Sequence, residues 1–386
     1  KRMQGVFFDI LTLDETGAVT IRNSTMEIQT PIFRLPELRT GDRIQGPALI
    51  VDATQTILVA PQSTATVLSD HVILDLRQFE GKSMYIGRGD TIDLDTPLSK
   101  ADPILLTVFG HRFMGIAETM GKTLQRTAAS TSIKERLDFS CAIFGPDGSL
   151  VANAPHIPIH LGSLSNAIIY QHNLWKGKLK PGDVLVTNHP EAGGTHLPDI
   201  TVITPVFHQG EIVFYVASRG HHADIGGAGI TAMSPNSRRL WQEGVSIKSF
   251  KLVKEGDFDE KGIVDLFMKA GEYPGCSATR KINDNINDLH AQISANQKGI
   301  RLVQALFEEF GKRFVQFYMA AIRNNAEQAV REFFCDMYHV HGGKPLHAVD
   351  YFDDGIPVEL SITFDGKKGD ATFDFTGTGP EEYGPM

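Results

Sequence analysis

The chain has 386 residues, 41% of them hydrophobic and 22% charged, a balance that indicates a globular protein with a large core and excludes a disordered one. Its net charge of -9 and isoelectric point near 5.9 argue against nucleic acid as a partner, because that binding needs Lys and Arg clustered on one face. No apolar run reaches the roughly 18 residues of a membrane span, and three scattered cysteines favour a reducing cytosol, so we expect neither a membrane nor a disulfide framework.

Residues 1–76 carry short β-type runs separated by Gly, Pro, Asn and Asp, and we predict a small β-rich domain there. Over residues 77–100 the apolar periodicity fades and charges mix with glycine, which is typical of a linker. The larger domain is expected over residues 101–386.

This larger domain opens with a helical pattern. Asp102 and Pro103 supply an N-cap and a first-turn proline, and apolar residues then recur at helical spacing as far as Met120. The run LDFSCAIFGPDGSLVANA predicts a hairpin whose turn lies at Gly145–Gly148.

Further strands are predicted over residues 183–187, 200–207 and 211–217. A second long helical stretch runs from Asn283 to Phe334, broken at Gly299 or Gly311 and packed on the sheet. The strands PVELSITF and DATFDFTG follow, joined by the turn GKKG. The predicted fold class is therefore mixed α and β, or α+β, with an antiparallel or mixed sheet and long helices.

Histidines crowd the middle of the chain, where eight of the fourteen fall between residues 156 and 222. Histidine is the commonest metal ligand and a frequent general base, so this crowding points to a functional site. The eight are His156, His160, His172, His189, His196, His208, His221 and His222.

The motif HLPD places His196 and Asp199 around a proline-stiffened bend. Pro198 fixes its own φ and biases Leu197 towards extended backbone, so the two polar residues cannot be neighbours on a regular helix. We predict a loop that leads into the next strand. A stiff loop limits the orientational freedom of its side chains, as metal coordination and proton transfer both require.

The strand after this one ends in RGHHADIGG, and a two-residue turn at Gln209-Gly210 would return that end to Asp199. Because strand side chains alternate, we expect one of His221 and His222 to face the cluster and the other to make a supporting contact. Two histidines and a carboxylate suit Zn, Mn or Fe with open coordination positions. The alternative is that these histidines only cap a hairpin.

Two other groups have a functional and an ordinary interpretation. His156 and His160 lie on a proline-interrupted loop before a helix, which is either an anion site or a simple cap. Arg136, near Asp138, either clamps a carboxylate through its planar guanidinium or belongs to a solvated charge run.

A polar stripe marks the second helical stretch. Asn285, Asp288 and Gln292 share one helix face among apolar neighbours. Such a stripe either faces water or lines a cleft.

The chain resembles the hydantoinase B half of the 5-oxoprolinase family over about residues 100–386. The resemblance is carried, in order, by TLQRTAASTSIKERLDFSCAIFGPDGSLVANAPHIPIHLGS, GDVLVTNHPEAGGTHLPDITVITPVF, ASRGHHADIGG, CSATRKINDNINDLHAQISANQKGI and ATFDFTGTGPEEYG. Residues 1–76 resemble the tail of the hydantoinase A half, fused upstream as in the single-chain eukaryotic form.

The resemblance implies ATP-dependent hydrolysis of 5-oxo-L-proline to L-glutamate in the cytosol, within glutathione metabolism. In that family the hydantoinase A-like half of the same polypeptide, an actin-like ATPase, is thought to bind ATP and phosphorylate the lactam oxygen. The B half would then open the ring with water. We also expect a homodimer.

Related carboxylase subunits with the B-type fold bind a metal through the matching HxxD motif and the first histidine of the HH pair. By resemblance, a divalent metal (Mg, Mn or Zn) is expected at His196, Asp199 and His221. The other expected roles are a general base at His222 or His160, a catalytic clamp at Arg136, and substrate binding by Asp138, His156, Asn285 and Asp288.

The chain departs from the family pattern in the stretch GGAGITAMSPNS after HHADIGG, which puts loop contacts there in doubt. It also lacks the nucleotide-binding body of the A half and stops inside the B half, so we expect the isolated chain to be inactive. The alternatives are a hydantoinase or N-methylhydantoinase reaction on another cyclic amide, and a non-catalytic, dimerising scaffold.

Overall fold

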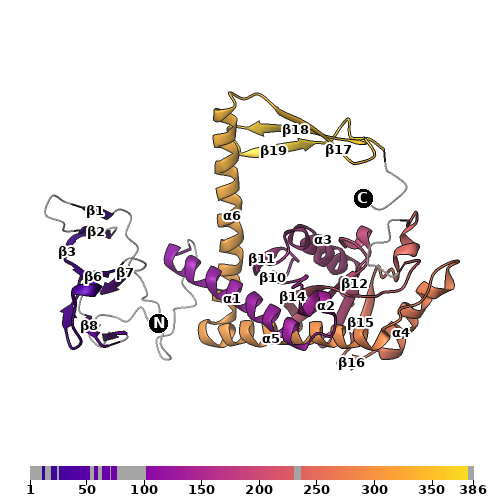
Figure 1. Ribbon diagram of the computed structural model, residues 1–386, viewed down its shortest axis with the longest axis horizontal. Helices are drawn as coiled ribbons and strands as arrows, with labels where there is room; N and C mark the ends of the chain where they lie inside the picture. Colours follow the sequence, from indigo (N-terminus) through magenta and orange to yellow (C-terminus); the bar gives the residue numbers. More distant parts are fainter. Residues whose placement is uncertain are drawn as a thin grey trace. The chain divides into compact units, whose positions relative to one another are not determined.

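The computed structural model describes residues 11–13, 19–23, 26–52, 56–59, 63–69, 71–75, 101–229 and 236–380. The chain divides into two units, residues 1–96 and 97–386 (Figure 1). The linker expected over residues 77–100 lies outside the described residues.

Short strands in three small sheets make up the described part of the first unit, which confirms its predicted β-rich character. One core of this unit is formed by Ile44, Ala48, Ile50, Val59 and Ala65. The sheets are β1 (Leu11–Leu13), β2 (Val19–Asn23) and β3 (Met26–Thr30); β4 (Ile32–Arg34), β6 (Ala48–Val51) and β7 (Thr56–Val59); and β5 (Arg43–Gln45), β8 (Thr64–Val67) and β9 (Val72–Asp75).

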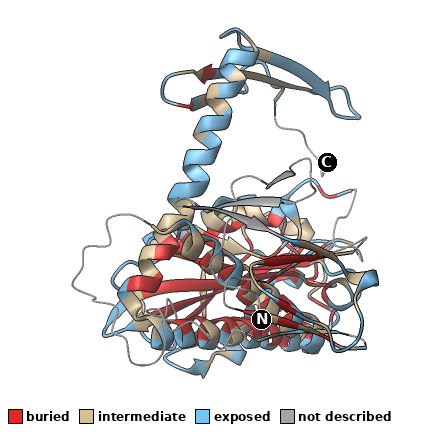
Figure 2. Ribbon diagram, turned by 90° about the vertical axis from the view of Figure 1, so that its left-hand side faces the viewer, coloured by how far each residue is buried: buried red, intermediate tan, exposed pale blue. Residues whose placement is uncertain are grey.

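A seven-stranded antiparallel sheet lies at the centre of the second unit, in the order β11-β10-β14-β13-β12-β15-β16. Together with the long helices it confirms the predicted fold class. Buried residues, red in Figure 2, concentrate in these strands and the helices against them. The strands are β10 (Phe139–Phe144), β11 (Leu150–Asn153), β12 (Val184–Thr187), β13 (Asp199–His208), β14 (Glu211–His221), β15 (Phe250–Lys254) and β16 (Asp257–Phe258).

Strand β14 is longer than the sequence predicts because both of its edges are paired. It bonds β13 on one side and β10 on the other, where Gly220 lies opposite Phe139. The turn before it is the predicted two-residue turn: Gln209 and Gly210 have φ of 53° and 83°, the left-handed values that such hairpins need.

The two faces of the sheet carry different helices, as Figure 1 shows. Helix α3 (Pro158–Leu174) packs on β10 and β14, and α5 (Ile282–Phe310) packs on β13 and β14 from the other side. Strand alternation separates the cores, because Leu185 belongs to the core on the α3 side while Val184 and Val186 belong to the core on the α5 side.

Helix α1 (Pro103–Thr127) begins at the predicted cap, where an Asp102 carboxylate oxygen accepts from the backbone N–H groups of Ile104 and Leu105 at 2.8 and 2.9 Å. It lies against α5. A Cβ on Gly299 of α5 would stand 2.4 Å from the sulfur of Met120. Gly299 therefore permits close helix contact and does not break the helix.

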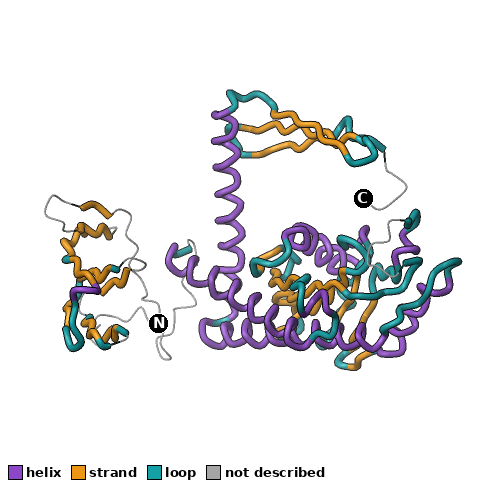
Figure 3. The backbone as a smooth tube through the Cα atoms, viewed as in Figure 1, coloured by secondary structure: helices purple, strands orange, loops and turns teal. Residues whose placement is uncertain are grey.

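The break falls at Gly311, whose φ of 81° and ψ of 144° end α5. Helix α6 (Lys312–Val340) follows and leads to a three-stranded antiparallel sheet (Figure 3). Its strands are β17 (Leu346–Tyr351), which the sequence analysis missed, β18 (Pro357–Asp365) and β19 (Asp370–Asp374). The described residues of this unit also form the α-helices α2 (Thr131–Lys134) and α4 (Glu260–Lys269). Among the described residues, no helix combines the length and apolar character of a membrane span.

Candidate metal centre

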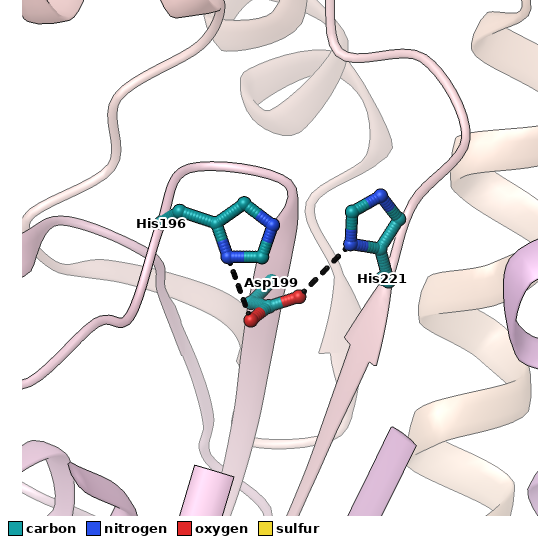
Figure 4. Close-up of side chains that lie close together, drawn as sticks. All are labelled: His196, Asp199 and His221. Atoms are coloured by element: carbon teal, nitrogen blue, oxygen red, sulfur yellow. Dashed lines mark hydrogen bonds and ion pairs between the residues drawn. The ribbon is translucent and has the colours of Figure 1, made fainter. Parts of the chain in front are cut away.

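The hairpin of β13 and β14 brings the predicted ligands together. Asp199 begins β13 and lies directly opposite His221, the last residue of β14. His196 reaches the same point through the bend before β13, in which the N–H of Asp199 donates to the carbonyl of His196 at 3.1 Å. The three residues converge from two strands and one loop, as the sequence predicts (Figure 4).

Close backbone packing fixes the loop that holds His196. Gly193 has φ of 81°, and a Cβ there would lie 2.2 Å from the backbone nitrogen of Ala167 in α3. A Cβ on Gly194 would lie 2.1 Å from the carbonyl oxygen of Asn188. Only glycine fits these two positions, which explains the GG that precedes THLPD.

The Asp199 carboxylate is the centre of the cluster. Its Oδ2 lies 2.8 Å from Nδ1 of His196 and 2.9 Å from Nε2 of His160, and it accepts from the hydroxyl of Thr195 at 2.5 Å. Its Oδ1 lies 3.1 Å from Nδ1 of His221. Four side chains thus converge on one buried carboxylate.

Electrostatics keep this carboxylate ionised. Burial opposes ionisation, but hydrogen bonds from His160, His196 and His221 outweigh it and hold the pKa of Asp199 far below its usual range. Burial likewise opposes protonation of His196, while the hydrogen bond to Asp199 raises the pKa of that histidine. The carboxylate of Asp199 is therefore kept in the form that can bind a cation.

The donor set fits a divalent transition metal. One ligand atom from each of His196, Asp199 and His221 lies within 4.8 Å of the others. Two imidazoles and a carboxylate are the ligands of many Zn, Mn and Fe sites with open positions. The side chains of His196 and His221 are 29% and 12% exposed, so one side of the cluster is accessible to solvent.

Asp138, predicted to bind substrate, lies at the edge of the cluster. Its Oδ1 is 3.8 Å from Nε2 of His160 and its Oδ2 is 3.6 Å from Nδ1 of His221. The residue before it, Leu137, has a φ of 59°, a left-handed conformation that costs a non-glycine residue free energy and is frequent at functional sites.

Arg219 is a buried charge that the sequence analysis missed. Its guanidinium donates to the hydroxyls of Thr201 and Ser163 and to the carbonyl of Gly193. Burial lowers the pKa of Arg219 to about 10, although the nearby negative charge of Asp199 acts in the opposite direction. The alternation of side chains along a strand could have identified it, because Arg219 lies two residues before His221 and shares its face of β14.

His222 faces the other side of the sheet, as alternation predicts for one member of the HH pair. The amide nitrogen of Gln292 donates to two strand carbonyls, which leaves its oxygen 3.1 Å from Nε2 of His222. Asn285 presents its amide nitrogen to Nδ1 of the same ring at 3.2 Å. Burial lowers the pKa of His222, so the ring is neutral.

This geometry bears on two predictions, the general base at His222 and the polar stripe of Asn285, Asp288 and Gln292. With both ring nitrogens of His222 bound to amides, neither is left to take a proton from water. The stripe of Asn285, Asp288 and Gln292 neither faces water nor lines a cleft, because all three are buried. The carboxylate of Asp288 accepts from the backbone N–H groups of Ala129 and Ser130 and so fixes the junction of α1 and α2.

The remaining candidates lie outside the metal-ligand groups. The Nδ1 atom of His156 accepts from the backbone N–H of Cys141 at 3.1 Å, and burial lowers the pKa of this histidine. Arg136 is exposed, and its guanidinium makes no hydrogen bond or ion pair within the part of the chain that the structure describes. The divergent loop after HHADIGG lies partly outside the described residues, which omit 230–235.

The chain belongs to the Hydantoinase B/oxoprolinase family, which matches residues 102–386. Residues 21–79 match the Hydantoinase/oxoprolinase C-terminal domain. Both matches confirm the resemblance seen in the sequence.

Named relatives agree with this assignment. The chain is 56% identical over 357 residues to 5-oxoprolinase PfmaA of Pestalotiopsis fici, covering 92% of this chain and 27% of that protein. It is 48% identical over 361 residues to 5-oxoprolinase of Saccharomyces cerevisiae, covering 93% and 27%. The chain thus spans about a quarter of the length of these relatives.

A solved structure has a similar fold. The crystal structure of ATP-dependent caprolactamase from Pseudomonas jessenii matches with a TM-score of 0.62 and 26% sequence identity, covering 71% of this chain and 46% of that chain.

Proposed function

We propose that the chain supplies the ring-opening half of an ATP-dependent lactam hydrolase that converts 5-oxo-L-proline to L-glutamate. The observation that carries the proposal is the convergence of His196, Asp199 and His221 on one point in a chain related to named 5-oxoprolinases. A convergent cluster with a solvent-accessible side argues against a non-catalytic scaffold.

The metal centre would act on the carbonyl. A divalent cation held by His196, Asp199 and His221 would polarise an oxygen of the substrate and lower the pKa of a bound water. The protein's part is to keep Asp199 ionised and His221 in place. Arg219 restrains the loop by donating to the carbonyl of Gly193 at 2.7 Å.

The other groups hold the substrate and complete the site. We assign the carboxylate of 5-oxo-L-proline to Arg136, because its guanidinium is exposed and a planar fork binds a carboxylate through two hydrogen bonds. Of the two proposed general bases, His160 contacts the cluster and His222 does not. Asp138 extends the polar wall beside His160.

The same proposal extends to ATP and to the partners. ATP would be bound by a hydantoinase A-like half of the same polypeptide, of which residues 21–79 match the C-terminal domain. We also propose a cytosolic homodimer that acts in glutathione metabolism. An isolated chain without the ATP-binding half would then bind metal without turning over substrate.

A second candidate is hydrolysis of another cyclic amide, such as a hydantoin. The structural likeness to an ATP-dependent caprolactamase favours it, since that enzyme's name gives a seven-membered lactam as its substrate. Competition between 5-oxo-L-proline and other cyclic amides in the complete enzyme separates the two candidates.

The test combines metal analysis with hydrolysis. We expect the purified chain to contain bound divalent metal, and His196→Ala and Asp199→Asn to lose it. In the complete enzyme the same variants should lose ATP-dependent formation of glutamate. His208→Ala is the control, because His208 is exposed at the far end of β13. Metal retained in both site variants would refute the metal centre.

A further inference from the structure

Exposed apolar side chains gather on α6 and the three-stranded sheet that follows it. Among the described residues, sixteen large hydrophobic side chains are exposed, and nine of them lie between residues 330 and 375. Val340, at the end of α6, is the most exposed of these, at 74%. Single exposed apolar residues are ordinary in a folded protein, whereas a concentration of them marks an interaction surface.

The sheet of β17, β18 and β19 has one apolar face. Side chains alternate along a strand, and residues directly opposite each other in neighbouring strands share a face. Leu360 pairs with Ala348 of β17, and Ile362 pairs with Phe373 of β19. The apolar face therefore includes Val358, Leu360, Ile362 and Phe364 of β18, with Ala348 and Phe373 beside them.

Helix α6 covers only one end of this apolar face. The ring centroid of Phe334 lies 5.6 Å from that of Phe364 and 6.4 Å from that of Phe373. Phe364 is 9% exposed, but Phe373 remains 51% exposed, and Ala348 is exposed on the other outer strand. Figure 2 shows this sheet mostly in the pale blue of exposed residues and the tan of intermediate ones. A small sheet needs a second layer over its apolar face, and α6 supplies only part of that layer.

A second uncovered apolar surface lies on α6 itself. Every residue from Asn324 to Val330 is exposed. Apolar residues recur on one face of the helix at alternating spacings of four and three: Ala326, Val330, Phe333, Met337 and Val340. Phe333 is turned about 100° around the helix from Phe334, which contacts the sheet. The sheet therefore leaves this stripe open, and such a stripe is typical of a helix that packs against another element.

The missing layer fits a further part of a longer polypeptide better than a second copy of this chain. A domain completes its hydrophobic core with its own chain as a rule. The chain covers 46% of the caprolactamase chain whose fold it shares, so more than half of that chain lies outside the match. It covers 27% of the 5-oxoprolinases of P. fici and S. cerevisiae. The longer relatives therefore contain enough additional polypeptide to cover this surface.

We propose that the apolar face of the β17–β19 sheet and the apolar stripe of α6 bind a further part of the same longer polypeptide, which covers Phe373 and Phe333. The occupant is an apolar segment from outside residues 1–386. In the complete enzyme α6 is then an internal helix with elements on two sides. The inference is independent of the metal centre and of the reaction proposed for it.

Photo-crosslinking in the complete enzyme identifies the occupant. With p-benzoylphenylalanine in place of Phe373, we expect ultraviolet light to join this position to a peptide outside residues 1–386, in a product with the mass of one chain. The same replacement at Thr372, which is exposed on the opposite face of β19, is the matched control and should not give this product. A product that contains two chains would identify a second copy as the occupant and overturn the proposal.

Thiol labelling measures how far the surface is covered. In the 386-residue chain, Phe373→Cys and Thr372→Cys should react with N-ethylmaleimide at similar rates, because both positions are exposed. In the complete enzyme Phe373→Cys should be protected about tenfold or more, while Thr372→Cys keeps its rate. Amide hydrogen exchange over residues 324–340 of the two unsubstituted proteins should slow in the complete enzyme. Equal labelling of Phe373→Cys in both proteins, together with equal exchange, would refute the docking surface.

Discussion

Asp199 and His221 are directly opposite residues of β13 and β14, and their side chains meet at 3.1 Å on the face of the sheet that α3 covers. The next residue, His222, is on the opposite face, bound by α5. One dipeptide thus contributes one side chain to the candidate metal centre and one to the core.

The HH pair should therefore separate function from stability. We expect His221→Ala to abolish metal binding and to cost little free energy of unfolding, because its ring is partly exposed. His222→Ala should instead lower the free energy of unfolding by about 2–4 kcal/mol, since it leaves a cavity and unpaired buried amides. Metal content and urea unfolding measured on both variants check this. Equal effects of the two substitutions on both quantities would contradict the assignment of faces.

Gln292 should hold the HH pair in place from α5. Gln292→Leu removes its bond to His222 and frees the carbonyls of Ile200 and Ser218, so we expect a loss of about 1–3 kcal/mol. Metal affinity should fall as well, because β14 ends at His221. Gln297→Leu on the exposed face of the same helix is the matched control. Unfolding by urea and a metal titration provide the measurements, and indistinguishable variants would refute the role.

Two glycine substitutions in α1 and α5 should change the stability of the protein in opposite directions. Gly299→Ala should destabilise the protein by about 1–3 kcal/mol, because the new methyl group overlaps the buried side chain of Met120. Gly115→Ala in α1 meets no atom within 4 Å and should stabilise by about 0.5–1 kcal/mol. Thermal unfolding measures both. Restoration of stability by Met120→Ala in the Gly299→Ala background would identify the overlap as the cause.

We expect Asp183 to make the free energy of unfolding depend on pH. Burial opposes its ionisation, but the ammonium of Lys251 at 2.6 Å and two backbone N–H groups hold the pKa of Asp183 below its usual value. A carboxyl with a lowered folded pKa stabilises the protein above its unfolded pKa of about 3.9 and loses that contribution as the pH falls below it.

We therefore expect Asp183→Asn to destabilise the chain at pH 7 and to approach the wild type near pH 3. Urea unfolding across this range tests the sign. A difference between the two proteins that stays constant with pH would show that the ion pair adds nothing to stability.

Local patterns in the sequence predicted the elements that depend on near neighbours. The Asp102 cap, the turn at Gln209-Gly210 and the break at Gly311 all follow from backbone preferences of single residues. The convergence of His196, Asp199 and His221 was also predictable, because one hairpin register sets it.

Contacts between distant segments were not predictable in the same way. Gly299 remained one of two candidate helix breaks, beside Gly311, because the sequence does not show that Met120 packs against it. The polar stripe of α5 was expected to face water or a cleft. Its actual partners, the strand carbonyls and the ring of His222, come from other parts of the chain and cannot be recognised from the helix sequence. Arg219 was missed because a buried guanidinium needs partners from three separate segments.

The stripe on α5 also limits how the domain can move. Gln292 and Asn296 donate to the carbonyls of Ile200 and Val202, so two successive turns of the helix are registered against two alternate residues of one strand. Apolar contacts would allow α5 to slide along the sheet, whereas these directional hydrogen bonds would all break together if the helix advanced by one turn. The sheet and α5 therefore provide a rigid support for the candidate metal centre, whose Asp199 and His221 belong to the same pair of strands.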